Sequence, residues 1–207
     1  MTTLGNGLYA ASHFEDALSV REAELAMLRR LGAPDYQIVV VQSNLANTYE
    51  LLGREEESMH MREDLYSRTS DIWGEEDRET LLEANNYAMS LGDLRRFEEA
   101  KALLRKSMPV ARRVLGQDDH LTLRMRWTYA EVLYTDDGAT LDDLREAVAT
   151  LEDVERTARR VFGGAHPATL QIEKGFRDAR GALRAREASS GVATRTRAAR
   201  ARRSEEE

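Results

Sequence analysis

The sequence contains no cysteine, only three prolines and no apolar run of the roughly 18 residues that a membrane span needs. The absence of cysteine excludes disulfides, thiolate nucleophiles and thiolate metal sites. It also suits a reducing compartment, so we expect a cytoplasmic location. The missing apolar run leads us to expect no membrane span. The N-terminal residues MTTLGNGLYAASHFEDAL lack the basic start and apolar stretch of a secretory signal.

Charge is distributed unevenly along the chain. The net charge is −7, yet residues 184–207 contain seven arginines and four glutamates. The rest of the chain is therefore strongly acidic and should repel nucleic acids and anionic membranes. The segment 188–207 has no periodic apolar residues, so we expect a disordered, Arg-rich tail whose charges are solvated. Contact with nucleic acid or a membrane through this tail is the alternative.

One turn sequence occurs four times. Its glycines are Gly32, Gly74, Gly116 and Gly163, spaced by 42, 42 and 47 residues. Each glycine is followed three positions later by Asp35, Asp77, Asp119 or His166. A glycine suits the left-handed conformation after a helix, and an aspartate is a good N-cap for the next helix. The repeated stretch therefore predicts a helix end, a turn and a helix start, rather than a catalytic loop.

The segments between these turns have helical periodicity. Apolar residues recur at intervals of three and four, as in Phe97, Ala100, Leu104, Met108 and Ala111. Small residues recur at Ala46, Ala88 and Ala130, where helices can approach closely. In another column, Ser58 occupies the position that Ala100 and Ala147 hold in other units, so alanine should be tolerated there. Five extra residues precede a capping box formed by Thr140 and Asp143, which predicts a helix from Leu141.

These patterns predict an all-α solenoid of stacked helical hairpins over residues 1–187. Its predicted parts are a partial unit 1–31, units at about 32–73, 74–115 and 116–162, a partial unit 163–187, and then the tail 188–207.

The repeat resembles the tetratricopeptide (TPR) repeats of the kinesin light chain type. The best matching segments are SNLANTYELLGREEES, residues 43–58, and NNYAMSLGDLRRFEEA, residues 85–100. The resemblance implies a right-handed superhelix whose first helices line a concave groove for a peptide segment of a partner protein. The groove positions that it implies are Asn44, Asn47, Asn85, Asn86, Arg124, Trp127 and Glu131, together with Ser43.

We therefore predict a non-catalytic protein-interaction module or scaffold. Asparagine suits such a groove because its amide both donates to and accepts from a peptide backbone, although the same amides could instead bond within their own hairpins. Trp127 could be a packing residue or a binding anchor. An adaptor or regulatory fragment of a larger kinesin-light-chain-like protein is a further alternative.

Nothing in the sequence points to an enzyme. The four histidines fall in different repeat units, and neither H-E-x-x-H nor a phosphate-binding G-x-x-x-x-G-K is present. We therefore expect no catalytic residue, no metal site and no cofactor.

Overall fold

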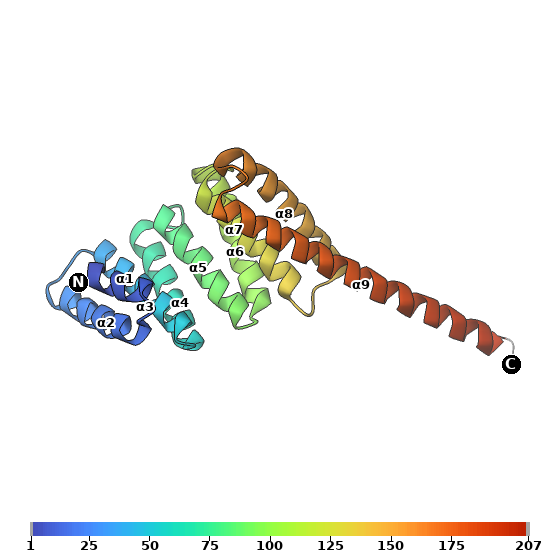
Figure 1. Cartoon of the computed structure of the whole chain (residues 1–207), viewed down its shortest axis with the longest axis horizontal. Coiled ribbons are helices and arrows are strands. Elements are labelled where there is room, and N and C mark those ends of the chain that lie inside the picture. Colours follow the sequence, from blue (N-terminus) through green and yellow to red (C-terminus); the bar gives the residue numbers. More distant parts are fainter. Residues whose placement is uncertain (1, 206–207) are drawn as a thin grey trace. The chain divides into compact units, whose positions relative to one another are not determined.

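The computed structural model describes the backbone of residues 2–205 and the side chains of residues 3–189. Every regular element within these residues is a helix (Figure 1). The helices are α1 (Thr2–Ala10), α2 (Phe14–Arg30), α3 (Asp35–Leu51), α4 (Glu55–Trp73), α5 (Arg78–Asp93), α6 (Phe97–Val114), α7 (His120–Thr135), α8 (Leu141–Phe162) and α9 (Pro167–Glu205). The all-α helical-repeat fold predicted from the sequence is confirmed. Within the described part of the chain, no helix is long and apolar enough to cross a membrane.

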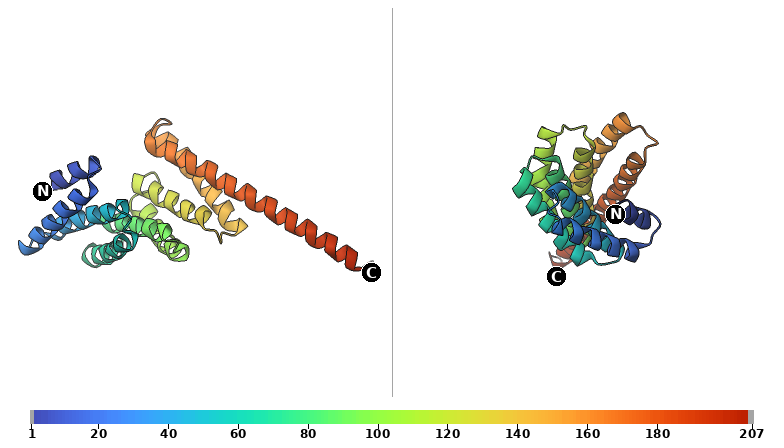
Figure 2. Two further views of the ribbon diagram at one scale, coloured as in Figure 1. Left: turned by 60° about the horizontal axis from the view of Figure 1, so that its bottom comes forward. Right: turned by 90° about the vertical axis from the view of Figure 1, so that its left-hand side faces the viewer.

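The chain forms two compact units. Unit 1 ends at Gln117 and contains α1 to α6, while unit 2 starts at Asp118 and contains α7 to α9. In each unit, helices that follow one another in the sequence pack side by side, as the ribbons in Figures 1 and 2 show. In unit 2, α9 contacts both α8 and α7. This is the packing expected of stacked hairpins.

The repeated turns have the backbone geometry that the sequence predicts. Gly32, Gly74, Gly116 and Gly163 all have positive φ angles, between 62° and 93°. Asp77 and Asp119 are N-caps, and each carboxylate accepts a hydrogen bond of 2.8 Å from the backbone N–H two residues later.

The N-cap expected at Asp35 is not formed. Pro34 is the N-cap of α3, and Asp35 is the first helical residue. Its carboxylate instead pairs with Arg68, which lies near the end of α4, the other helix of the hairpin. His166 is a better cap than its residue type suggests, because its Nδ1 accepts from the Ala168 N–H at 3.2 Å.

The acidic residues of the turns have a second role. Glu76 accepts from Arg113 at 2.8 Å, and Asp118 accepts from Arg160 at 2.6 Å, so an acid before each first helix pairs with an arginine near the end of the second helix. These pairs are largely exposed and each contributes little energy. They do explain why acidic turns and arginine-rich helix ends recur together in the sequence.

Packing between helices follows the small-residue positions. Ala46, Ala88 and Ala130 are completely buried, as predicted for positions where helices approach closely. Around them lie the apolar side chains of the i, i+3, i+4 pattern, such as Leu45 and Leu104. The capping box at Thr140 and Asp143 is also present, and α8 begins at Leu141 as expected.

The C-terminal segment differs from its sequence-based expectation. The sequence predicts disorder from residue 188, whereas α9 continues as one helix to Glu205, well beyond the ends of α7 and α8 (Figures 1 and 2). Alanine and arginine are good helix formers, and they make up much of this segment. Residues 206–207, and the side chains from residue 190 onward, lie outside the described part.

Candidate binding site

Each hairpin has a first helix (α1, α3, α5 or α7) and a second helix (α2, α4, α6 or α8). The centre of the candidate site is Arg62, which lies in the second helix α4. It is only 2% exposed. In the sequence it stands four residues after the small residue Ser58, whereas Leu104 and Leu151 stand four residues after the equivalent Ala100 and Ala147. Two units thus place leucine where this one places a charged side chain.

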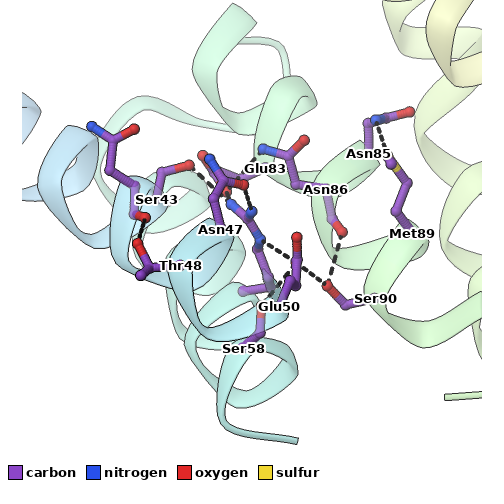
Figure 3. Close-up of polar contacts among 12 residues, drawn as sticks. Ser43, Asn47, Thr48, Glu50, Ser58, Glu83, Asn85, Asn86, Met89 and Ser90 are labelled. Carbon is purple, nitrogen blue, oxygen red and sulfur yellow. Dashed lines mark hydrogen bonds and ion pairs between the residues drawn. The ribbon is translucent and has the colours of Figure 1, made fainter. Parts of the chain in front are cut away.

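The Arg62 guanidinium is held by side chains from two neighbouring first helices. It donates to Ser43 Oγ of α3 at 2.9 Å and to Asn47 Oδ1 of α3. It also lies 3.4 Å from Glu83 Oε2 of α5, and Glu83 is only 1% exposed. Figure 3 shows Ser43, Asn47 and Glu83 turned toward a common point between α3 and α5. A buried cation requires such compensation, because an isolated charge in a protein interior is strongly unfavourable.

Glu50 extends this cluster along α3. Its Oε1 accepts from Ser58 of α4 at 2.8 Å and from Ser90 of α5 at 3.1 Å, and lies 3.6 Å from Arg62 Nε. Asn86 of α5 joins by donating to Glu83 at 3.4 Å. We call this set the Arg62 network: Arg62, Ser43, Asn47, Glu50, Ser58, Glu83, Asn86 and Ser90. It links α3, α4 and α5 by polar contacts.

The preceding hairpin repeats the same arrangement. Arg21 of α2 is 4% exposed and donates to Asn6 Oδ1 at 2.9 Å, as Arg62 does to Asn47. In both pairs the arginine follows the asparagine by 15 residues. Arg21 also donates to the Asn44 carbonyl at 2.8 Å and to Thr48. Burial lowers the pKa of Arg21 from its usual value, while Tyr9 and Glu24 oppose this shift.

The predicted asparagines of unit 1 fall into two groups. Asn44, Asn47 and Asn86 are half-buried on α3 and α5, in or beside the Arg62 network. Asn85 is completely buried and lies apart from the network beside Met89, to whose sulfur its amide donates at 3.4 Å (Figure 3). Its position in the helix–helix contact makes Asn85 a packing residue, so it does not belong to the candidate binding surface.

The other predicted residues belong to α7 in unit 2. Arg124, Trp127 and Glu131 are all half-buried there. Trp127 Nε1 is buried, and it lies 3.2 Å from the point where a side chain on Gly175 of α9 would begin. Tyr134 Oη lies 3.7 Å from the same point. The indole therefore fills the contact between α7 and α9, which favours packing over a role as a binding anchor.

Neither buried arginine is among the candidates that the sequence predicts. The sequence does contain a detectable signal. A charged residue interrupts the apolar face of α2 and of α4 at a position where α6 and α8 have leucine. Glu83 carries the same signal, because Val41, Met125 and Ile172 occupy its position in other first helices and all three are buried. Asn6 is easily missed because two glycines, poor helix formers, surround it.

Among the described residues, no three histidine or acidic side chains are placed to hold a metal ion. Burial raises the pKa of Tyr134 to about 12, with smaller effects of Glu131 and Asp178, so this phenol stays protonated.

Comparison with known proteins identifies the repeat. Residues 84–121, from α5 to the start of α7, match the family model described as Tetratricopeptide repeat. This segment is therefore similar to a tetratricopeptide repeat. No curated protein sequence matches it.

Solved structures of TPR-like repeats share this fold. Two of them are crystal structures of a kinesin-light-chain-like protein of Podosopora anserina with nearly identical TPR-like repeats, and one of the two carries a single substitution. They give TM-scores of 0.73 and 0.71 at 18% identity. Each comparison covers 97% of this chain, and 92% or 93% of the other. BtubC (BKLC) of P. vanneervenii gives 0.62 at 18% identity, over 92% of this chain and 79% of the other.

Proposed function

We propose that this TPR protein is a non-catalytic scaffold that binds an extended segment of a partner protein on the α3–α5 face of unit 1. The TPR fold itself supports an interaction role. The observation that carries the specific proposal is that Arg62 donates to both Ser43 Oγ and Asn47 Oδ1.

This contact fixes which polar atoms a partner can meet. Only the carbonyl of an asparagine amide can accept from a guanidinium, so the orientation of the Asn47 amide is set by chemistry. Its Nδ2 group keeps two N–H donors and has no hydrogen-bond partner among the described residues. The Asn44 amide, one turn earlier, likewise has none there. The half-buried surface of α3 therefore offers amide donors at both positions, and the orientation of the Asn47 donors is fixed by Arg62.

Oriented amide donors select for acceptors. The carbonyl groups of an extended peptide are acceptors at regular spacing, and they are present whatever the side chains. Preorganisation lowers the entropy cost of binding, because Asn47 does not have to be ordered when the partner arrives. Arg124 and Glu131 remain proposed groove residues of unit 2, where an arginine would favour an acidic partner residue.

Peptide selection provides the test. A phage library of random peptides of about 12 residues, each about 40 Å long when extended, is selected on the wild-type chain. It is then counter-selected on an Asn44→Ala/Asn47→Ala variant. We expect peptides that bind the wild type and lose about tenfold or more affinity for Asn47→Ala in calorimetry. Gln171→Ala, on an exposed position of unit 2, is the matched control and should bind normally. If every selected peptide binds the asparagine variants as tightly as the wild type, this face is not the site.

A further inference from the structure

The outward face of α9 is basic and exposed, whereas the same face of α7, the first helix of the preceding hairpin, is apolar and buried. In α7, Leu123, Ala130 and Leu133 are at most 1% exposed because other helices cover them. At the same repeat positions α9 has Leu170, which is 51% exposed, and the exposed arginines Arg177 and Arg180. A face that is apolar and covered in α7 is thus basic and open in α9.

These cations lie on one side of the helix. Lys174, Arg177 and Arg184 follow one another at intervals of three and seven residues, which places them on one face with Leu170 and Arg180. Ile172 and Ala179, which pack inward, lie on the opposite face. We call Lys174, Arg177, Arg180 and Arg184 the α9 basic stripe.

The stripe has no acidic partner in its own surroundings. None of its four side chains forms an ion pair within the described residues, although Glu173 and Glu187 on the same helix pair with Arg159 and Arg145 of α8. Arg180 instead lies over the ring of Phe176, 5.5 Å from its centroid. The whole helix holds ten basic and four acidic residues, in a chain with a net charge of −7.

Unit 1 carries the complementary charge. Residues 1–117 include twenty acidic and fourteen basic side chains. Glu55 begins α4 and Asp93 ends α5, and neither forms an ion pair within the described part of the chain. Partial desolvation, and then the carboxylates of Glu50 and Glu55, raise the pKa of Asp93. The effect of Glu50 and Glu55 on Asp93 indicates that these carboxylates lie near one another, while the neighbouring Arg54 and Arg96 pair with Glu57 and Glu99.

We propose that the α9 basic stripe of one molecule docks on the acidic end of unit 1, around Glu55 and Asp93, of a second copy of this chain. Exposed Leu170 beside the stripe adds apolar contact to the charge complementarity. The two surfaces differ, so the contact is heterologous, and a pair of molecules keeps one free basic stripe and one free acidic end. Assembly therefore continues beyond a dimer as concentration rises.

Sedimentation velocity on the full chain tests this docking. At about 0.01 M salt the Debye length is about 30 Å, and at about 1 M it is about 3 Å. We expect the weight-average sedimentation coefficient to rise with concentration at low salt and to return to the monomer value at high salt. Lys174→Glu/Arg177→Glu/Arg184→Glu should stay monomeric at low salt. All three positions are exposed, so circular dichroism should show an unchanged fold.

Reversing the charges of both surfaces together distinguishes specific docking from an effect of net charge on association. Glu55→Lys/Asp93→Lys alone should also stay monomeric, and combining it with the three α9 reversals should restore association. A wild type that is monomeric at low salt overturns the proposal, as does association that persists in the reversed variants. If the wild type is monomeric but binds an RNA oligonucleotide or anionic vesicles through the stripe, α9 serves a polyanion instead of a second copy.

Discussion

Arg62 and Glu83 form a buried ion pair between α4 and α5, with 3.4 Å between Nη1 and Oε2 and side chains that are 3% and 2% exposed. The units that follow have apolar residues at both positions, whereas the preceding hairpin has Arg21 at the position of Arg62. A buried pair of this kind rarely adds stability over apolar side chains of similar size. Its presence in unit 1 is better explained by what Arg62 does for Ser43 and Asn47.

Removing one partner of this pair should be costly. Arg62→Leu leaves the Glu83 carboxylate buried without a cation, and we expect a loss of about 3–5 kcal/mol in the free energy of unfolding. Arg62→Leu/Glu83→Met installs the residue types of Leu104 and Met125 and should recover most of that loss. Urea denaturation of both variants checks this. Equal stability of the single variant and the wild type would contradict the buried pair.

Ser58→Ala should destabilise the chain, contrary to the expectation from its place in an alanine column. Ser58 is completely buried, and its hydroxyl donates to Glu50 at 2.8 Å. Losing this bond to a charged group should cost about 1.5–3 kcal/mol. Ser189→Ala, which removes a hydroxyl from an exposed position of α9, is the control and should change stability little. A Ser58→Ala melting temperature at or above that of the wild type would restore the sequence-based expectation.

Two glycines of α9 should respond oppositely to alanine. At Gly175 a Cβ would lie 3.2 Å from Trp127 Nε1, so Gly175→Ala should force α7 and α9 apart and cost about 1–3 kcal/mol. At Gly181 nothing lies within 4 Å, so alanine should instead stabilise the helix by about 0.5–1 kcal/mol. Thermal unfolding of the two variants measures the difference. A stabilising Gly175→Ala would show that the indole does not pack as described.

Asp93→Asn should stabilise unit 1 near neutral pH. An acidic residue at a helix C-terminus opposes the helix dipole, and the folded-state pKa of Asp93 is raised. A raised carboxyl pKa means that the ionised form is disfavoured on folding, so its cost is present above the folded pKa and disappears as pH falls below the unfolded value. We expect a gain of about 0.3–1 kcal/mol at pH 7 that vanishes near pH 3. A gain of the same size at both pH values would rule out ionisation as its cause.

The repeat fold could be predicted from the sequence, because each turn and apolar column has a local cause. Glycine spacing, the caps at Asp77 and Asp119 and the capping box at Thr140 are local signals, and all of them are confirmed. The prediction for Asp35 was wrong because Pro34 takes the capping position. Local patterns thus determined most helix limits.

The candidate site was less predictable because it depends on contacts between distant residues. The Asn47 contact with Arg62 spans 15 residues, and the Glu50 contact with Ser90 spans 40. Periodicity gives the face of a helix on which an asparagine lies, but not the arginine that reaches it from another helix. Asn85 and Asn86 are adjacent in the sequence, yet only Asn86 contacts the network.

The most direct test of the account compares peptide binding and stability in Arg62→Leu/Glu83→Met. This variant keeps an apolar core but removes the donor that orients Asn47. Calorimetry with a peptide selected on the wild-type chain should show affinity lowered about tenfold or more, while urea denaturation shows a near-normal free energy of unfolding. Wild-type affinity in a folded Arg62→Leu/Glu83→Met chain would contradict the claim that Arg62 prepares this face for a partner.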